Sequence, residues 1–473
     1  MAIDENESEE THPNVWRMAV LLAFGSLMAG LDTSLVNLGL HAIGDSVGAS
    51  LTRVQWIHSG YLLALAASLP ISGWLSRRYG AGSLWIWALV AFTVTSMLCA
   101  ASPNIEMLIV ARVLQGLAGG LLIPAGMTIL GQVAGKARMG RVIAISTVPA
   151  IVAPAFGPLL GALLISALSW QWLFLINVPI GALGTVLAVR LLPPGRREAA
   201  GSLDLVSLAL VTLGLPLTVY CISTVGDGSF PWILLVLGVV ALSAFGWRSL
   251  HGNGTLVDLR LLGNRRFAAA SMEVFFAGAA LFGGLIVMPL YFQIQLGVGI
   301  VDAGLLLMAF SLAAAVTFPP AGWLSDRFGG GLVAATGLAV TVAGTVPMVL
   351  LPETPNLVLL EFLQVARGVG LALAGSPGVS AALAAVRTHE IADASVQVNV
   401  FSRVGGALGS ALLVSILMND GVAETIPLHA FRAAFWWLAA TATVALGAAV
   451  WLALEQRKEA MKSQPTQVRR SMI

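Results

Sequence analysis

The sequence predicts an all-α polytopic membrane protein, and three observations support that fold class. Hydrophobic residues make up 58% of the 473 residues, charged residues only 10%, and the mean hydropathy is +0.89. A soluble globular domain carries about 25% charged residues. Apolar runs of about 20 residues, the length that a helix needs to cross roughly 30 Å of hydrocarbon, recur along nearly the whole chain. The net charge of +2 is too small to indicate nucleic-acid binding.

Fourteen apolar runs are predicted membrane spans, joined by short connections. They cover about residues 17–40, 54–75, 83–101, 106–130, 142–164, 170–192, 203–223, 231–249, 267–290, 303–324, 331–351, 357–380, 392–418 and 431–454. The acidic, polar first residues lack the basic region and apolar core of a signal peptide. The first span is therefore expected to direct membrane insertion.

The distribution of Lys and Arg predicts the orientation, because cytoplasmic loops carry an excess of basic residues. With both termini in the cytoplasm, 20 of the 25 Lys and Arg residues fall on the cytoplasmic side. These are Arg17, Arg77, Arg78, Lys136, Arg138, Arg141, Arg190, Arg196, Arg197, Arg248, Arg260, Arg265, Arg266, Arg327, Arg387, Arg457, Lys458, Lys462, Arg469 and Arg470.

An internal repeat predicts the domain organisation. The octapeptide GWLSRRYG at 73–80 returns as GWLSDRFG at 322–329, and both copies fall in cytoplasmic loops, after spans 2 and 10. Two related six-helix bundles, at 17–192 and 267–455, would place the copies in equivalent loops. Residues 203–250 are then two inserted helices, and residues 1–16 and 456–473 are cytoplasmic tails. Two parallel six-helix halves are typical of a transporter.

The motifs, taken in order, resemble one family. LDTSLVN at 31–37, the octapeptide, RVLQGLAGG at 112–120, PAFGPLLGA at 154–162 and WQWLFLINVPIG at 170–181 all fall on or beside the matching spans. NRRFA, PLYFQ and RVGGALG follow in the second half. Together they resemble the 14-helix drug:proton antiporter branch of the major facilitator superfamily. That resemblance implies the major facilitator fold, a bacterial-type cytoplasmic (inner) membrane, and a proton gradient as the energy source with no cofactor.

Two ionisable residues inside the spans are predicted to lie at one depth. Asp32 is roughly 22 Å above the inner edge of span 1, and Arg112 is roughly 9 Å below the outer edge of span 4, at 1.5 Å per residue. In a 30 Å core both sit at nearly the same level. The resemblance implies that the first-helix acid takes part in proton coupling and that the Arg tunes it. The alternative is a static ion pair that joins the two helices.

Other intramembrane charges are candidates because a charge at the bilayer centre costs several kcal/mol. Glu273, in span 9, is a candidate second proton-coupling residue or cation-binding group; the alternatives are a carboxylate that reaches interfacial water or pairs with a base. Arg367 either mirrors Arg112 or caps backbone carbonyls. Glu361 lies in a shallow position near the outer surface.

A wide apolar cavity with few polar anchors is expected between the spans, which suits amphipathic or cationic organic compounds. Packing against lipid or neighbouring helices is the alternative for each single side chain. The candidate lining residues are Asn37, Tyr61, Gln115, Asn177, Tyr291, Gln397, Asn399 and Arg403.

Glycines, prolines and charges in two motifs are candidates for gating. They are Gly73, Arg77, Arg78, Gly80, Pro154, Gly157, Pro158, Gly161, Gly322, Asp326, Arg327 and Gly329. Gly80 and Gly329, at the ends of the octapeptides, are expected to permit a turn. In the family the first octapeptide carries an acid that interacts with a helix of the other half. Here that position is Arg77, so this interaction is not expected to carry over. Either Arg77 adds to the inside-positive charge, or Asp326 makes the charged contact alone.

The sequence therefore predicts a proton-coupled exporter of amphipathic organic molecules that works by alternating access, as a monomer, on small-molecule substrates. An exporter of one defined metabolite, lipid, peptide or amino acid is the nearest alternative, and a non-transporting sensor or scaffold is a further one. No nucleophile–base constellation suggests an enzyme, and no His, Cys and carboxylate cluster has metal-ligand spacing. Cys99 and Cys221 are expected to pack as apolar side chains rather than to form a disulfide.

Overall fold

The structure is a computed structural model that describes residues 14–49, 51–135, 138–193, 195, 203–223, 231–251, 258–352, 355–418 and 426–470. The predicted tail residues 1–13, the loop arginines Arg196 and Arg197, and the side chains of Asn37, Pro154 and Pro158 lie outside the described part.

Every predicted span coincides with a helix or a helix pair. The helices are α1 (Val15–Val47), α2 (Leu51–Ser68), α3 (Ile71–Tyr79), α4 (Ala81–Ala100), α5 (Ile105–Val133), α6 (Met139–Ala167), α7 (Trp172–Leu175), α8 (Asn177–Leu191), α9 (Leu205–Ser223), α10 (Trp232–His251), η3 (Leu259–Gly263), α11 (Arg265–Leu290), η4 (Tyr291–Gln295), α12 (Ile300–Phe328), α13 (Gly330–Val349), α14 (Leu357–Ala384), η5 (Thr388–Glu390), α15 (Ile391–Met418) and α16 (Leu428–Arg470).

Eleven helical segments of the described residues are long and apolar enough to cross a membrane. The prediction of fourteen spans and the placement of both termini stay predictions. Two spans differ in detail from their expected form: the one expected over 54–75 is divided into α2 and α3, and the one expected over 170–192 into α7 and α8. The first division has a local cause in the sequence. Pro70 lies at the division, directly before α3, where its missing N–H and fixed φ are compatible with a helix start.

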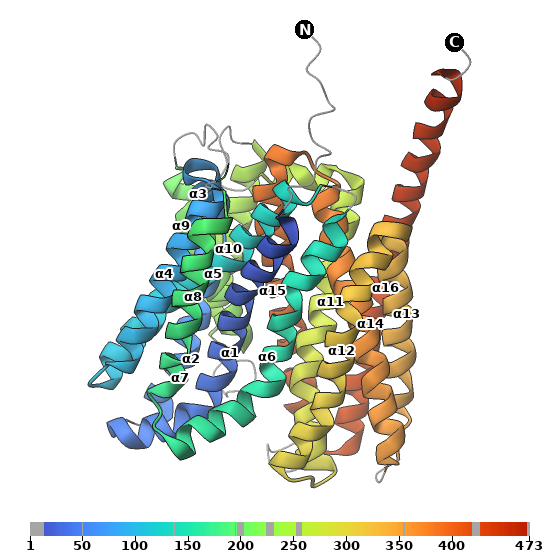
Figure 1. Cartoon of the computed structure of the whole chain (residues 1–473). Helices are drawn as coiled ribbons and strands as arrows, with labels where there is room; N and C mark the ends of the chain where they lie inside the picture. The colour runs from blue at the N-terminus through green and yellow to red at the C-terminus, as the bar shows by residue number, and fades with distance from the viewer. Residues whose placement is uncertain are drawn as a thin grey trace. The chain divides into compact units, whose positions relative to one another are not determined.

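The chain divides into two compact units that share one scheme of helix contacts. Unit 1 comprises Met1–Lys136, Ile145–Leu259 and Thr388–Val400; unit 2 comprises Ala137–Ala144, Arg260–Arg387 and Phe401–Ile473. In unit 1, α5 contacts α1, α2 and α4, and α8 contacts α1 and α4; in unit 2, α14 contacts α11, α12 and α13, and α16 contacts α11 and α13. Figure 1 shows α4, α5 and α8 side by side in unit 1 and α13, α14 and α16 side by side in unit 2.

The equivalent central helices α5 and α14 also begin in the same way. In each, an Asn at the N-cap accepts a hydrogen bond from a backbone N–H of the first turn: Asn104 from Met107, and Asn356 from Val358, both at 2.9 Å. Such caps satisfy N–H groups that have no partner within the helix. The shared caps and contacts support the correspondence of α1 with α11 and of α5 with α14.

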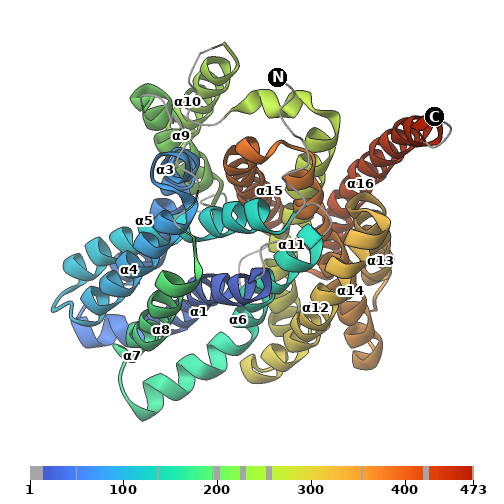
Figure 2. The same cartoon turned by 45° about the horizontal axis from the view of Figure 1, so that its top comes forward.

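The inserted helices α9 and α10 pack against each other at the edge of unit 1, where α9 also contacts α2 (Figure 2). Asp204, directly before α9, accepts hydrogen bonds from Arg248 of α10 at 2.9 and 3.2 Å. This contact, with help from Ser207, holds the pKa of Asp204 below its usual range. Large apolar side chains of α10 are exposed, as expected for a helix that faces lipid; Trp232, Ile233 and Trp247 are 67%, 77% and 67% exposed.

Glycine allows α5 to approach α2 closely. A side chain at Gly116 would collide with the backbone carbonyl of Tyr61, and one at Gly120 would collide with that of Leu65. Small residues at such positions let the backbones of membrane helices come into contact.

We expect Gly116→Ala to destabilise the protein by about 1–3 kcal/mol, because a methyl group must be forced between two backbones. The matched control is Gly246→Ala in α10, where an added methyl group meets nothing within 4 Å. Thermal unfolding in detergent should show a lower midpoint for Gly116→Ala than for Gly246→Ala. Equal midpoints would contradict the close approach.

Candidate functional site

A fully buried ion pair lies inside unit 1. Asp32 of α1 and Arg112 of α5 are both 0% exposed, and Arg112 Nη1 donates to Asp32 Oδ2 at 2.5 Å. These are the two residues that the depth estimate placed at one level. Helices α1 and α5 are each continuous through this region, so their backbone N–H and C=O groups form hydrogen bonds within the helices. The two charged side chains therefore pair with each other.

Amide and hydroxyl groups complete the surroundings of the Asp32 carboxylate. Gln115 Nε2 and Asn177 Nδ2 each donate to Asp32 Oδ1 at 3.0 Å. Gln115 Oε1 accepts from Arg112 Nη1 at 2.7 Å, and Gln115 Nε2 also donates to Ser96 Oγ at 2.7 Å. Asp32 therefore has three donors, drawn from α5 and α8, and a compensating charge.

Arg112 is held from its other sides by backbone and aromatic groups. Its Nε donates to the carbonyl oxygen of Ile57 at 3.1 Å, and its Cζ lies 4.2 Å from the ring centre of Tyr61 and 5.6 Å from that of Phe174. Arg112 Nη2 and Asn177 Oδ1 are buried and lack hydrogen-bond partners among the described residues. The cluster is thus fully buried, and within the described residues Arg112 Nη2 can still donate and Asn177 Oδ1 can still accept a hydrogen bond.

Three of the residues predicted to line a substrate cavity lie in this cluster. Tyr61, Gln115 and Asn177 are each 0% exposed and surround the Asp32–Arg112 pair. Ser96 and Cys99, which the sequence analysis did not single out as site residues, join through Gln115; Cys99 Sγ lies 3.5 Å from Gln115 Oε1. Both lie on α4, three residues apart, and form no recognisable motif with Gln115 in the sequence. Cys99 and Cys221 are buried free thiols.

Glu273 of α11, in unit 2, carries a buried carboxyl group. It is 0% exposed, and neither carboxyl oxygen has a hydrogen-bond partner among the described residues. It lies against α14, where a side chain at Gly378 would collide with its carboxyl group. The described residues include no basic partner for this carboxyl group.

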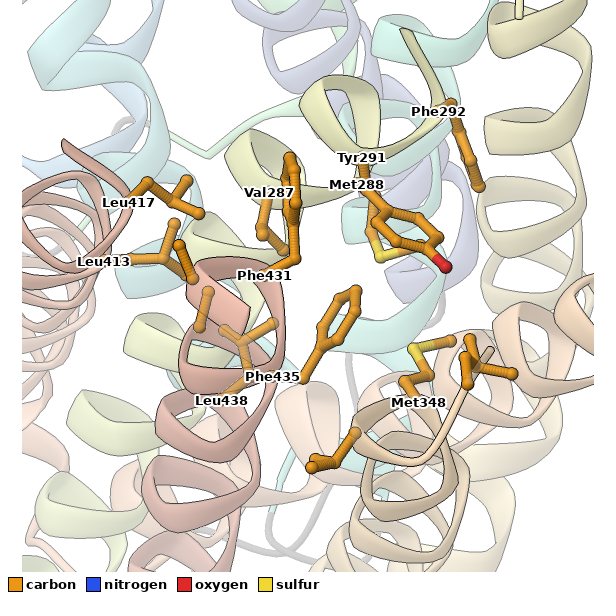
Figure 3. Packing of buried hydrophobic residues seen from close by; sticks show 14 of the residues in the cluster. Val287, Met288, Tyr291, Phe292, Met348, Leu413, Leu417, Phe431, Phe435 and Leu438 are labelled. Carbon is orange, nitrogen blue, oxygen red and sulfur yellow. The ribbon is translucent and has the colours of Figure 1, made fainter. Parts of the chain in front are cut away.

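Tyr291, the first residue of η4, lies in a packed aromatic cluster directly after the end of α11. It is 0% exposed, and its ring centre lies 5.4 Å from that of Phe431 and 5.3 Å from that of Phe435. Figure 3 shows this cluster, with Met288 and Met348 beside the rings. The packing stabilises the contact between α11 and α16.

The remaining lining candidates have specific contacts at the start of α15. Gln397 donates to the carbonyl oxygen of Asp258 at 2.8 Å, and Asn399 donates to that of Ser395 at 2.8 Å and approaches Met127 Sδ at 3.2 Å. Arg403 is half-buried in unit 2. The side chain of Asn37 lies outside the described residues.

The two octapeptide copies end in the same backbone geometry. Gly80 has φ 88° and Gly329 has φ 89°, and each donates its N–H to the carbonyl oxygen four residues earlier, of Ser76 and Ser325, at 2.9 Å. A residue with a side chain rarely adopts this conformation. The expectation that these glycines permit the turn is confirmed.

The second copy binds the start of α6 within unit 2. Asp326 accepts from the backbone N–H groups of Gly140 and Arg141 at 2.8 and 3.4 Å, and from Arg141 Nε at 2.8 Å. An acid at a helix N-terminus is favoured by the free N–H groups and the helix dipole. Gly322 allows this approach, because a side chain there would collide with the backbone of Gly140 and Arg141.

The first copy makes the same kind of contact with the charges exchanged. Arg77 forms an ion pair with Asp393 in the first turn of α15, within unit 1. The side chains are 14% and 13% exposed. Both interpretations of Arg77 from the sequence are therefore corrected: it is not simply a surface charge, and Asp326 does not make the charged contact alone. Gly73 lies beside Asp393 and Val396 and allows the approach.

The other motif residues have less specific surroundings. Arg78 is exposed, and Arg327 lies over the rings of Trp323 and Phe328 at 5.3 and 5.4 Å. Gly157 of α6 lies directly against Ser34 of α1, and Gly161 is buried. Within the described residues, no group of three or more His, Cys, Asp and Glu residues is placed to hold a metal ion.

Comparisons with known proteins agree with the fold and the motifs. The family model described as Major Facilitator Superfamily matches residues 22–410 and 270–472. The "Multidrug resistance protein B homolog" of Mycobacterium tuberculosis is 33% identical over 412 residues, covering 85% of this chain and 76% of that protein. The "Putative multidrug resistance protein MdtD" of Yersinia pestis is 31% identical over 342 residues, covering 71% and 73%.

Solved structures show the same fold at low sequence identity. The human organic anion transporter MFSD10 superposes with a TM-score of 0.62 at 15% identity, covering 91% of this chain and 100% of that chain. The proton:xylose symporter XylE superposes with a TM-score of 0.62 at 14% identity, covering 91% and 94%.

Proposed function

The chain belongs to the major facilitator superfamily, and from this premise we propose that it is a proton-coupled antiporter that exports amphipathic or cationic organic compounds. It would work as a monomer in the inner membrane, by rocking of its two halves around a central site. The names of the relatives from M. tuberculosis and Y. pestis, both multidrug resistance proteins, support this substrate class.

The observation that carries the proposal is the buried Asp32–Arg112 pair. Placing ionised groups inside a membrane protein is costly, and those that remain are usually functional. The Asp32 carboxylate is held by side chains from α5 and α8. When these helices move apart, the carboxylate loses its donors and can take up a proton; when they close, Arg112 displaces that proton. The pair thus links protonation to helix movement.

Proton release on substrate binding tests the proposal. We expect purified protein in a weakly buffered detergent solution to release protons when tetraphenylphosphonium is added, and Asp32→Asn to release none. The matched control is Glu106→Gln, which alters an exposed acid paired with Arg53 at the surface. Wild-type protein that releases no proton would contradict proton coupling. Unchanged release in Asp32→Asn would contradict the role of Asp32.

Transport in vesicles provides the second measurement. Reconstituted wild-type protein should move tetraphenylphosphonium against its gradient when a pH gradient is imposed, and Asp32→Asn should not. Asp32→Glu keeps the negative charge and should retain part of the activity, which separates loss of coupling from loss of folding.

A further inference from the structure

A second buried arginine, Arg367 of α14, has no carboxylate partner within the part of the chain that the structure describes. It is 3% exposed, and its only hydrogen bond within the described residues joins Nη1 to the neutral amide oxygen Oε1 of Gln364 at 2.7 Å. Its Nε is buried without a partner. Arg367 therefore does not cap a backbone carbonyl, which was one of the two interpretations of its sequence position.

Arg367 and Arg112 differ in the residue that faces the guanidinium group. Arg112 of α5 faces Asp32 of α1, whereas Arg367 of the equivalent helix α14 faces Gly284 of α11. The first carbon of a side chain at Gly284 would come within 2.5 Å of Arg367 Nη2. The residue of α11 that faces Arg367 thus has no side chain, whereas the residue of α1 that faces Arg112 is a carboxylate.

Glu273 does not replace the missing counter-charge. It lies on the same helix as Gly284, but 11 residues away, which is about 16 Å along α11 at 1.5 Å per residue. Its own contact on α14 is Gly378, 11 residues from Arg367, as expected for two antiparallel helices in register. The acid and the base are therefore buried separately in unit 2.

The geometry of the guanidinium group indicates what it can bind. Nε and Nη2 form the edge that donates two parallel hydrogen bonds to a carboxylate, sulfonate or phosphate. Within the described residues, Nη1 is the one guanidinium nitrogen of Arg367 that donates a hydrogen bond, to Gln364. The ring centre of Phe310 lies 5.9 Å from Cζ. An aromatic ring beside a guanidinium with a free bidentate edge suits an oxyanion attached to an apolar body.

We propose that Arg367 binds the anionic group of a transported molecule, so that the substrates include anionic or zwitterionic amphiphiles as well as cations. This inference rests on the proposed function, because the transport cycle must expose Arg367. The bound anion would take the place that Asp32 holds beside Arg112, and the guanidinium would be compensated only when substrate is present.

Paired probes test the inference: 2-naphthalenesulfonate and (2-naphthyl)trimethylammonium, which share a ring and differ in charge. We expect Arg367→Gln to weaken sulfonate binding to purified protein by at least tenfold and Arg367→Lys to weaken it less, because lysine keeps the charge but lacks the bidentate edge. Binding of the ammonium probe should change by less than threefold in both variants.

Gly284 provides an independent variant. Gly284→Asp supplies an internal carboxylate to Arg367 and should weaken sulfonate binding at least tenfold. The control Gly284→Asn crowds Arg367 Nη2 to the same extent but lacks the charge, so it should weaken sulfonate binding clearly less than Gly284→Asp does. Equal loss in both variants, or sulfonate binding that Arg367→Gln leaves unchanged, would overturn the inference.

Two further measurements separate substrate binding from the binding of a free inorganic anion, and failure of this inference from failure of the proposed function. Replacing chloride by gluconate should leave the dependence of sulfonate binding on Arg367 intact; if Arg367 affects only chloride binding, the site holds a free inorganic anion and the substrate assignment is wrong. Wild-type vesicles that move the ammonium probe against a pH gradient but do not bind the sulfonate contradict this inference alone. Vesicles that move neither probe contradict the proposed function.

Discussion

Arg77→Asp is expected to shift the conformational equilibrium of the protein by roughly 5- to 150-fold, because it brings two carboxylates face to face at the first turn of α15. The pair is mostly buried, so its loss should cost more than the 0.2–1 kcal/mol typical of an exposed pair and less than the 3–5 kcal/mol typical of a fully buried one. We estimate about 1–3 kcal/mol for the change.

Distances between spin labels would measure this shift. Trp87, 71% exposed on α4, and His389, at the start of the segment that leads into α15, are suitable positions in a background without Cys99 and Cys221. We expect a longer or broader distance distribution in Arg77→Asp than in wild type. An unaltered distribution would show that the contact has no part in gating.

The exchanged pair is the matched control. Arg77→Asp combined with Asp393→Arg should restore part of the wild-type distribution. Restoration should be incomplete, because the first turn of α15 favours an acid over a base through the helix dipole. An exchange that restores nothing would mean that Arg77 acts through a different neighbour.

Glu273→Gln is expected to leave the thermal stability unchanged or higher while it abolishes transport driven by a pH gradient. Among the described residues the side chain has no hydrogen-bond partner to lose, and a neutral amide of the same shape removes the cost of burying a charge. Asp32→Asn, by contrast, should lower the thermal stability. It leaves Arg112 buried without a counter-charge and should cost about 3–5 kcal/mol.

Thermal unfolding in detergent and vesicle transport would be measured on the same preparations. Glu361→Gln is the control, because it makes the same chemical change at a half-buried acid of α14. We expect it to retain transport. A loss of stability in Glu273→Gln as large as that in Asp32→Asn would show that the carboxylate has an unrecognised partner.

The sequence allowed prediction of features that depend on one helix or one local motif. Asp32 and Arg112 could be placed at one depth because helix rise and bilayer thickness are both fixed. The ends of the octapeptides could be predicted because only glycine adopts their backbone conformation at low cost. The repeat of the octapeptide predicted equivalent helix pairs, which the contacts of α5 and α14 show.

Features that depend on the choice between several partners could not be predicted. Gln115 and Asn177 carry amides that suit a wet cavity and a buried carboxylate equally well, and only the packing of α1, α5 and α8 selects the carboxylate. Asp393 lies 316 residues from Arg77, so nothing local in the sequence joins them. The division of span 2 at Pro70 depends on whether a neighbouring helix satisfies the freed backbone groups.

The four buried Asp, Glu and Arg residues of the described chain also determine how transport should respond to voltage. While Asp32 is ionised, its charge and that of Arg112 cancel, and Arg367 contributes one positive charge. The sum is zero when Glu273 is ionised and +1 when it is protonated. A helix movement in the second state would carry net charge through the electric field, at about 2.3 kcal/mol per charge per 100 mV if the whole field is crossed. The membrane potential should therefore drive only the proton-loaded half of the cycle.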